Sequence, residues 1–342
     1  MNASKLKGNL LEYFVSRILL NCGFKNVKAD GLFIYNSRGL RLINGKGSSH
    51  DADVLMSPPI QMPFSYPYRL LFECKAYKSP VGLPIVRNAL GLRYDINEFE
   101  IITTTQINAR KNLRRRNLAV ESRARYLYQV GVASINGFTK PATEFSINNK
   151  IPLLSLDWIL PHTIISLFDN IDDSLVDSID EDKLSEITDF LNGDNNGDGE
   201  LYLDTENRTL SRIYDGFSRF QNRVLIGLLE TGDLIFITTE NISGIEYLMS
   251  NYQPSTARFH YNPEEKELWE LTIQGSDNNI TFKFHLPEQI QSLWKSYNYD
   301  FHAGLAMKGS IFGKLFIFVQ DETMPFRIIN LDRDWLEGLQ AE

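Results

Sequence analysis

The sequence predicts a mixed α/β protein, in which a central mixed sheet flanked by helices is followed by a β-rich part. Up to about residue 160, apolar stripes with helical spacing alternate with short apolar runs, a pattern typical of a sheet covered by helices. Beyond residue 207, short alternating runs separated by turn signals indicate strands and few helices. We therefore expect domains at residues 1–160 and 207–342, joined by an acidic linker or helical segment at residues 161–206.

The first half begins with an amphipathic helix at residues 6–22. Leu6, Leu10, Phe14 and Ile18 recur at i, i+4 spacing and share one helix face, and Gly23 is typical of a helix end. The apolar runs that follow alternate as strands do or repeat with helical spacing. In order, they predict strands at 32–35, 50–56 and 69–77, a helix at 84–91, a strand at 99–104, a basic helix at 109–128, and strands at 129–134 and 153–156.

The second half predicts a β-rich (α+β) domain. Turn signals such as Thr231-Gly232-Asp233 separate its apolar runs. A short helix is expected at residues 289–296, after Pro287. The expected strands are residues 223–229, 233–239, 257–261, 267–273, 280–286, 314–319 and 326–331.

The distribution of charge differs sharply between the two halves. The whole chain has a net charge of −8, but residues 1–150 hold 22 Lys+Arg against 10 Asp+Glu, a balance of +12. This asymmetry indicates a module that faces nucleic acid, joined to one that does not. Residues 169–206 carry fourteen acids and one base, Lys183, which predicts an extended, self-repelling segment or a peripheral helical one. Such a segment could inhibit the first domain by competing for its basic face.

The composition also bounds where the protein acts. No apolar run approaches the ~20 residues that span a bilayer, so no membrane association is expected. The first residues lack the hydrophobic core of a cleaved signal peptide, so we expect a cytoplasmic protein. Cys22 and Cys74 lie in apolar periodic segments, which is typical of reduced core cysteines.

Three residues predict a catalytic site: Asp53, Glu73 and Lys75. Glu73 and Lys75 lie two apart in an apolar strand, so their side chains share a face at a separation of roughly 7 Å, while Cys74 points to the opposite face. Charged side chains are rarely buried without partners, so they are not expected to fill a core. Two carboxylates beside a lysine are what Mg²⁺-dependent hydrolysis of a phosphodiester requires.

Each residue can be given a role. Asp53 and Glu73 would bind Mg²⁺, with Mn²⁺ as a substitute, and the backbone carbonyl of Cys74 would complete the protein ligands. Lys75 would orient or deprotonate the attacking water, or neutralise charge on the phosphate. Glu12, at the edge of the first helix, would add a carboxylate, although an ordinary surface acid has the same pattern.

Neighbouring residues and chance matches bear on this assignment. Asp51 shares the face of Asp53 and is a candidate to assist it, whereas His50 should point away unless the strand is bulged. Glu-x-Lys also occurs at residues 181–183 and 264–266, in polar sequence without a preceding strand acid. An ion pair on an edge strand is therefore the alternative for Glu73 and Lys75 taken alone.

Several ordered segments carry a resemblance to a known family. They are residues 8–14 with 22–24, 45–53, 72–75, 137–142 and 148–154. Together they resemble the PD-(D/E)xK nuclease superfamily, and most of all the Mrr-like restriction endonucleases, over roughly residues 5–160. The resemblance implies a restriction-endonuclease-like fold, metal-dependent DNA hydrolysis, Asp53, Glu73 and Lys75 as core catalytic residues, and Glu12 as a common helix contribution. Many Mrr-like members have Gln where Glu73 stands, and the change favours a metal ligand. The second half shows no such resemblance.

Basic residues predict where DNA would be bound. The predicted helix at residues 108–128 is strongly basic, and contacts of this kind position a duplex through its phosphates without identifying its sequence. Lys46 and Lys78 lie close in sequence to the predicted catalytic strands. The residues of the helix that we expect to contact DNA are Arg110, Lys111, Arg114, Arg115 and Arg116.

These observations predict a Mg²⁺-dependent endodeoxyribonuclease of restriction or anti-phage defence. The alternatives are a nuclease-fold protein that binds DNA or assembles without cleavage, and a nuclease for branched DNA or RNA. A homodimer or larger assembly is expected, because one such site cuts one strand. The last domain, with 18 acids against 12 bases in residues 207–342, is expected to recognise a target, sense a signal or bind a protein partner rather than hold DNA by charge.

Overall fold

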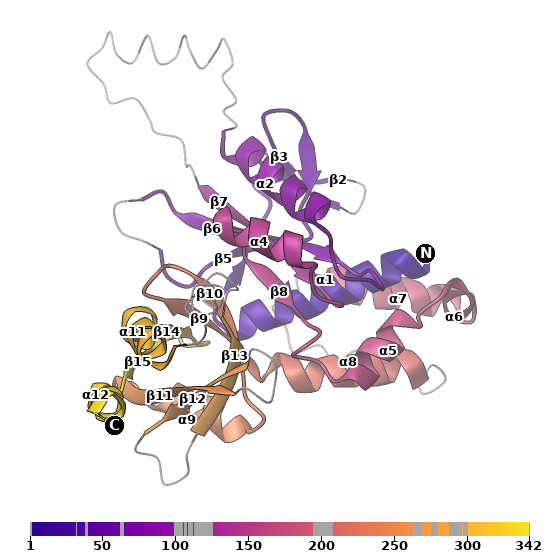
Figure 1. Ribbon diagram of the computed structural model, residues 1–342. Coiled ribbons are helices and arrows are strands. Elements are labelled where there is room, and N and C mark those ends of the chain that lie inside the picture. Colours follow the sequence, from indigo (N-terminus) through magenta and orange to yellow (C-terminus); the bar gives the residue numbers. More distant parts are fainter. Residues whose placement is uncertain are drawn as a thin grey trace.

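The protein is mixed α/β, with a five-stranded sheet, a three-stranded sheet and a closed seven-stranded barrel (Figure 1). The barrel is built from the second half of the chain, and the two open sheets from the first. The computed structural model describes residues 2–31, 33–37, 40–61, 65–98, 105, 108, 112, 126–193, 208–262, 268–274, 280–286, 296 and 300–341.

The five-stranded sheet is mixed and has helices on both faces, as expected. Its strand order is β1-β5-β6-β7-β8, antiparallel from β1 to β6 and parallel from β6 to β8. Helix α1 packs on one face, and α2 and α4 pack on the other. The bounds are α1 Ala3–Asn21, β1 Lys25–Asn26, β5 Val54–Ser57, β6 Tyr68–Lys75, α2 Leu83–Asn97, β7 Leu127–Ser134, α4 Lys140–Asn148 and β8 Leu153–Ser155.

Strand β6 shows the alternation that the sequence predicts. Leu70, Phe72 and Cys74 are buried in the core on the α1 face, and Leu71 is buried in the core on the opposite face. The odd-numbered positions thus continue to Glu73 and Lys75 on the face away from Cys74. Both cysteines are buried and free, in agreement with the sequence-based expectation of a reduced pair.

Several boundaries in the first half differ from the prediction. The expected strand 50–56 is two strands, β4 (Ser49–Asp51) and β5, in different sheets. The break occurs because the Ala52 N–H bonds to the Arg41 carbonyl, after which the partner changes from β3 to β6. The three-stranded sheet is β2 (Ile34–Ser37), β3 (Leu40–Asn44) and β4.

In the rest of the first half, one helix is longer than predicted, one helix was not predicted, and two predicted elements lie mostly outside the described residues. Helix α2 runs to Asn97 rather than ending at residue 91, and α4 was not expected. The predicted strand 99–104 lies outside the described residues, as does most of the predicted helix 109–128. The last two residues of that predicted helix, Leu127 and Tyr128, instead begin β7, where they pair with β6.

The seven strands of the second half close into a barrel, which the sequence did not predict. Their order is β10-β13-β12-β11-β15-β14-β9, and closure depends on a parallel pairing of β11 with β15. Large rings fill the interior, including Trp269, Phe259 and Phe282. The bounds are β9 Val224–Leu229, β10 Leu234–Thr238, β11 Ser255–Asn262, β12 Leu268–Ile273, β13 Ile280–His285, β14 Lys314–Phe318 and β15 Phe326–Leu331.

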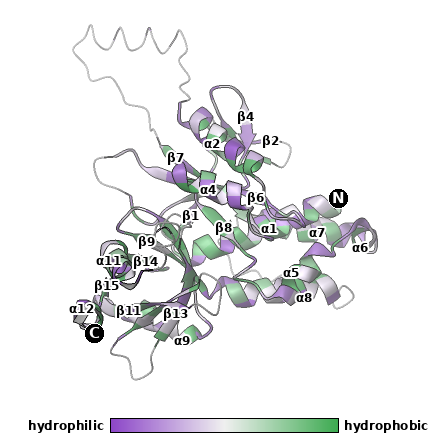
Figure 2. Ribbon diagram, in the orientation of Figure 1, coloured by the Kyte–Doolittle hydropathy of each residue, from purple (hydrophilic) through white to green (hydrophobic). Residues whose placement is uncertain are grey.

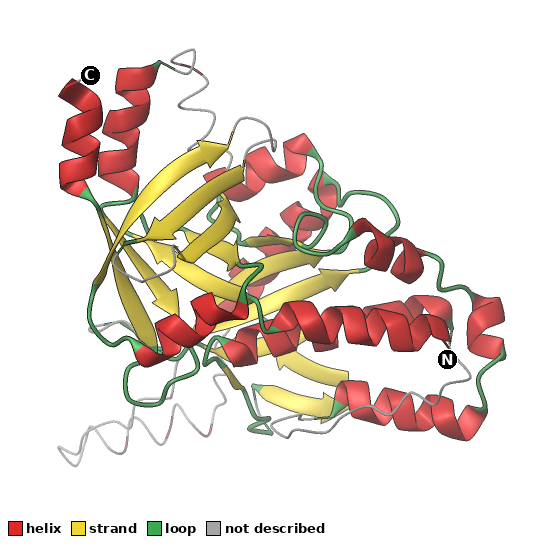
Figure 3. Cartoon of the chain, turned by 90° about the horizontal axis from the view of Figure 1, so that it is seen from below, coloured by secondary structure: helices red, strands yellow, loops and turns green. Residues whose placement is uncertain are grey.

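All seven expected strands are thus present within one or two residues of their predicted ends. Among the described residues of this half, four helices were missed: α8 (Arg208–Gln221), α9 (Ile242–Ser250), α11 (Phe301–Ile311) and α12 (Arg333–Ala341). The last two lie beside one another at the C-terminal end of the chain (Figure 3). The predicted helix 289–296 falls almost wholly outside the described residues.

The acidic segment is helical and packed up to residue 193, which agrees with the helical alternative predicted for it and not with an extended linker. It forms α5 (His162–Asp169), α6 (Asp173–Asp177) and α7 (Glu181–Asn192), followed by α8 (Arg208–Gln221). Leu184, Ile187 and Leu191 are buried on one face of α7, which contacts α1. Hydrophilic and hydrophobic residues alternate along these helices (Figure 2), and the acids of α7 are exposed.

Helix α1 lies between the sheet and the second half of the chain. The Phe14 ring stacks on Phe217 of α8, with centroids 4.3 Å apart, and Phe24 meets Phe318 of β14 at 5.8 Å. One apolar core therefore extends from the α1 face of the sheet to the barrel. Among the described residues, we find no helix with the length and apolar character needed to cross a membrane.

Candidate active site

Glu73 and Lys75, two of the predicted catalytic residues, lie at the end of strand β6. The Lys75 Nζ lies 2.9 Å from Glu73 Oε2 and 3.9 Å from Asp53 Oδ2. All three side chains are largely buried, with between 14% and 22% of each exposed. Desolvation acts to lower the pKa of Lys75, but the charges of Glu73 and Asp53 outweigh it, and the net effect is a raised pKa. Lys75 is therefore a cation at neutral pH.

Asp53 reaches the same place from the bend before β5. Val54 pairs with Phe72 in the antiparallel ladder, so Asp53 lies opposite Glu73 at the strand end. The Cys74 backbone N–H donates to Asp53 Oδ2 at 2.7 Å and fixes this carboxylate against β6. Burial, followed by the nearby charge of Glu73, raises the pKa of Asp53 to about 7.

Glu12 joins the cluster from α1. Burial, together with the charges of Asp53, Asp51 and Glu73 and an opposing effect of Lys75, raises the pKa of its carboxyl to about 8. Partial burial and the charge of Glu73 also raise the pKa of Asp51. Glu12 is thus not an isolated acid on the helix surface. The structure brings together all four residues that we predicted as catalytic, with Asp51 beside them.

The cluster has more negative than positive charge. Four carboxyl groups, those of Glu12, Asp51, Asp53 and Glu73, lie near one ammonium. Burial is the main cause of the raised pKa values of Glu12 and Asp53, and the neighbouring negative charges add to it. Carboxylate oxygens are the ligands that Mg²⁺ prefers, and a divalent cation would relieve this repulsion, so the donor set fits the predicted metal. Among the described residues, however, no three His, Cys, Asp or Glu side chains already form a group that could hold a metal ion.

The position of Lys75 accounts for this difference. Its ammonium lies between Asp53 and Glu73, whose oxygens face it instead of a common centre. The backbone of Cys74 contacts the cluster through its N–H, while its thiol is buried in the core on the α1 face, as predicted. Metal binding by the Cys74 carbonyl remains a prediction.

The glycine-rich loop before β4 is held by α2. The Gly47 N–H donates to Asp95 Oδ1 at 2.8 Å, and His50 Nε2 lies 2.7 Å from Asp95 Oδ2. A Cβ on Gly45 would lie 2.0 Å from Asp95 Oδ2, so this glycine is required by the contact with Asp95. His50 therefore contacts Asp95 and is turned away from the cluster of Glu12, Asp53 and Glu73, as expected. Lys46 is exposed on this loop and lies 3.5 Å from Glu98.

The predicted DNA-binding residues are only partly described. Arg110, Lys111, Arg114, Arg115 and Arg116 lie outside the described residues. Lys78 is exposed. The pKa of Lys7 is lowered mainly by the burial of Lys7 itself, and next by the nearby charge of Lys78. Lys7, which the sequence did not single out, lies on α1 five residues before Glu12 and donates to the Asp169 carbonyl at 2.8 Å.

A second residue that sequence reasoning missed is Ser134 on β7. It pairs with Lys75 in the parallel ladder, so the two side chains share a face of the sheet. The hydroxyl is completely buried and has no hydrogen-bond partner in the described part of the chain. Such buried, unsatisfied groups are rare and costly. No sequence signal separates Ser134 from a small core residue.

Comparisons with known proteins leave the family undetermined. No protein-family model matches the chain, and no curated protein matches it. One solved structure, the crystal structure of a protein of unknown function, AF1548, can be aligned with this chain. The alignment covers 54% of this chain and 78% of AF1548, with 16% sequence identity and a TM-score of 0.30. A TM-score this low does not establish a common fold. The resemblance to PD-(D/E)xK nucleases therefore remains a prediction.

Proposed function

We propose that this protein is a Mg²⁺-dependent endodeoxyribonuclease, with a restriction-endonuclease-like first domain, that acts in restriction or anti-phage defence. The observation that carries the proposal is the convergence of Glu12, Asp53 and Glu73 around Lys75, from three separate elements. Such a cluster is expensive to maintain for stability alone, because it places like charges together in a poorly solvated position. Strongly perturbed carboxylates beside a cation are typical of functional sites.

Within this site, Asp53 and Glu73 would hold the metal. The bound Mg²⁺ or Mn²⁺ would supply positive charge for the phosphate and a more acidic water. Glu12, with a pKa of about 8, is suited to take the proton of the attacking water near neutral pH. Lys75, whose pKa is raised, is suited to neutralise charge on the phosphate rather than to deprotonate water.

The charge balance of the first half supports a nucleic-acid substrate. Residues 1–150 carry a balance of +12, and Lys7 and Lys78 lie close enough to influence one another. Backbone phosphates favour such positive surfaces regardless of sequence. Cleavage of both strands would require a homodimer or larger assembly, because one site cuts one strand.

The test compares metal-dependent cleavage of several substrates. Purified protein would be incubated with plasmid, linear duplex, branched DNA and RNA, with Mg²⁺, Mn²⁺ or EDTA. Wild type should cut DNA only with metal, and Lys75→Ala should lose cleavage by roughly 100-fold or more. Lys25→Ala, which alters an exposed lysine on β1, serves as the matched control and should cut normally. Equal activity in wild type and Lys75→Ala, both folded, would exclude this site.

A second candidate is a protein that binds DNA or assembles without cutting it. The observation that favours it is the 2.9 Å ion pair of Lys75 with Glu73, a contact that can serve structure alone. In that case DNA binding would survive Lys75→Ala, and no substrate would be cut with either metal. If RNA or branched DNA alone is cut, the site acts but the restriction role is wrong.

A further inference from the structure

A large cavity lies between the five-stranded sheet and the barrel, away from the acidic cluster. Its volume is about 1250 Å³, above the ~300–1,000 Å³ usual for ligand pockets. Strand β6 joins the two places: Leu70 lines the cavity, and Glu73 lies three residues later, about 10 Å along the strand. The cavity is thus separate from the proposed nuclease site but built on the same strand.

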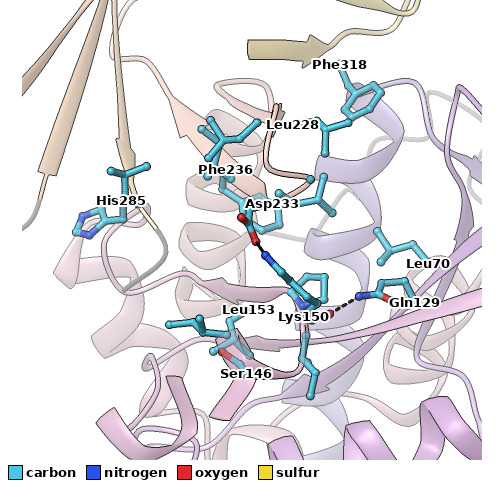
Figure 4. Close-up of a pocket in the computed structure, with 18 of the residues that line it drawn as sticks. Leu70, Gln129, Ser146, Lys150, Leu153, Leu228, Asp233, Phe236, His285 and Phe318 are labelled. Carbon is cyan, nitrogen blue, oxygen red and sulfur yellow. Dashed lines mark hydrogen bonds and ion pairs between the residues drawn. The ribbon is translucent and has the colours of Figure 1, made fainter. Parts of the chain in front are cut away.

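The walls of the cavity are mainly apolar and come from both halves of the chain. Figure 4 shows Leu228, Phe236 and Phe318 of the barrel across from Leu70 and Leu153 of the sheet. Several aromatic rings line the space, a property typical of sites for small organic molecules. These rings are Phe24, Tyr68, Phe138, Trp158, Phe236, Phe316, Phe318 and Phe326.

The charges around the cavity are nearly balanced. Among the described residues, four cations and three acids line it, and the acid Asp233 is already bonded to Lys150 and to Thr231. A multiply charged phosphate compound would need a clear excess of cations. The lining therefore fits a molecule that is largely apolar and carries few charges.

Lys150 crosses the boundary between the two halves at this cavity. Its Nζ lies 2.6 Å from Asp233 Oδ1, and the dashed line in Figure 4 marks this contact. Its backbone is left-handed, with φ of 51°, and it is the one residue other than glycine with a positive φ in the described part of the chain. Arg93 donates to the Lys150 carbonyl at 3.2 Å, and Gln129 donates to the same oxygen.

This conformation caps the end of α4. The Lys150 N–H donates to the Ile147 carbonyl at 3.1 Å, and the Ile151 N–H donates to the Ser146 carbonyl at 2.8 Å, the two bonds of a Schellman motif. The cap places the lysine stem at the edge of the cavity and its ammonium on the barrel. The ion pair thus acts as a clasp between the two walls.

We propose that this cavity binds a small, predominantly apolar organic molecule, which the Lys150–Asp233 pair encloses. The proposal rests on the size of the cavity, its aromatic walls, its near-neutral charge and the ion pair that joins its two walls. It goes beyond the nuclease proposal, because the cavity is lined by different residues from the acidic cluster. The molecule would contact the sheet and the barrel together.

The test uses 8-anilinonaphthalene-1-sulfonate, an aromatic dye, as the probe, with the full-length protein. Wild type should bind it saturably, with enhanced dye fluorescence and a raised melting temperature. Trp158 lines the cavity, so excitation of tryptophan should transfer energy to the bound dye, and Trp158→Phe should reduce this transfer. A dye that only marked unfolded surface would lower the melting temperature, which would overturn the proposal.

Variants locate the bound dye. Leu228 is half-buried and lines the cavity, so Leu228→Trp should fill the space and weaken dye binding at least tenfold, measured by direct dye excitation. Leu175→Trp, at a half-buried position on α6 outside the cavity, is the control and should bind as wild type does. Equal affinity in Leu228→Trp and wild type, both folded, would overturn the proposal.

The clasp has its own variant. Glycine is the usual residue at a left-handed helix end, so Lys150→Gly should keep or raise the melting temperature, while loss of the ammonium should make dye dissociation at least fivefold faster. If the dissociation rate is unchanged, Lys150 does not enclose the ligand. Loss of DNA cleavage in other variants has no bearing on either result, so the two proposals can fail independently.

Discussion

Lys75 Nζ lies 2.9 Å from Glu73 Oε2, the side chain two residues before it on the same face of β6. The pair is mostly buried and lies beside Asp53, so the lysine is the nearest positive charge to a group of acids. A lysine in this position has two opposite effects on metal binding. Its charge keeps the carboxylates close together before the metal binds, and the same charge repels the metal cation.

Replacement of Lys75 should therefore separate metal binding from cleavage. Lys75→Met keeps the apolar stem but removes a unit charge about 4 Å from the metal-binding oxygens, so Mg²⁺ affinity should rise about tenfold or more. Cleavage should fall by roughly 100-fold, because the phosphate loses its positive partner. Isothermal titration with Mg²⁺ and a plasmid assay measure the two effects, with Lys25→Met as the control.

Unchanged Mg²⁺ affinity in Lys75→Met would mean that the metal binds elsewhere. Reduced affinity would mean that the lysine supports the ligands rather than repelling the cation. Either result would remove the assigned role of Lys75, whatever happens to cleavage.

The acids predict an unusual dependence of stability on pH in the absence of metal. The pKa values of Glu12 and Asp53 are raised to about 8 and about 7 in the folded state. Between the unfolded values, near 4, and these folded values, the folded state holds more protons than the unfolded state, so the free energy of unfolding falls as pH rises. We expect a loss on the order of 3 kcal/mol between pH 5 and 8 from this site.

Urea unfolding at pH 5, 6.5 and 8, in EDTA and in 10 mM Mg²⁺, measures this effect. Mg²⁺ should restore stability at pH 8 and have little effect at pH 5, because metal binding needs deprotonated carboxylates. The Glu12→Gln/Asp53→Asn double variant should show a flatter profile and no response to Mg²⁺. A wild-type profile that rises from pH 5 to 8 would contradict the assignment.

The local pattern of the sequence was enough to predict most strands, because alternation reflects burial directly. It places Cys74 opposite Glu73 and Lys75, and the barrel strands within one or two residues. Closure of the barrel could not be predicted, because it rests on β11 pairing with β15, some seventy residues away in the chain. The break before β5 was missed for the same reason, since Ala52 bonds to Arg41 on a different strand.

Charge counting left two structures open for residues 169–193, an extended chain or a peripheral helix. The segment is helical, because Leu184, Ile187 and Leu191 recur with helical spacing and are buried against α1. Net charge records composition and not period, so it cannot detect an amphipathic helix. In the site, the four predicted catalytic residues and the neighbouring Asp51 were all named from the sequence. The approach of Ser134 could not be predicted, because it depends on the pairing of β6 with β7.

The glycine-rich loop gives a direct test of local structure. Gly45→Ala would place a Cβ 2.0 Å from Asp95 Oδ2 and 2.9 Å from His50 Nε2, so the loop must move away from α2. We expect a loss of about 1–3 kcal/mol in the free energy of unfolding. Gly91→Ala, inside α2 with no atom within 4 Å of the new Cβ, should instead gain about 0.5–1 kcal/mol.

Chemical denaturation of both variants measures these values, and the sign of the difference is the test. Equal effects at residues 45 and 91 would mean that the Asp95 contact does not hold the loop. If the loop also positions Lys46 for DNA, Gly45→Ala should weaken DNA binding at low salt, and Gly91→Ala should not.

The acidic helices allow inhibition of the nuclease site to be separated from structural support. Deletion of residues 169–206 should destabilise the protein, because it removes the α7 contact with α1, the Asp173 oxygen that accepts the Ala3 N–H, and the Asp169 carbonyl bound by Lys7. Loss of activity in the deletion would thus say nothing about inhibition.

Glu181→Gln/Asp182→Asn changes only exposed charges in the first turn of α7 and should leave the melting temperature within about 2 °C. If the acids compete with DNA for the basic face of the first domain, this variant should cut DNA faster at low salt and equally at high salt, because screening removes the competition. Equal rates at both salt concentrations would show that the acids of α7 do not restrain the nuclease.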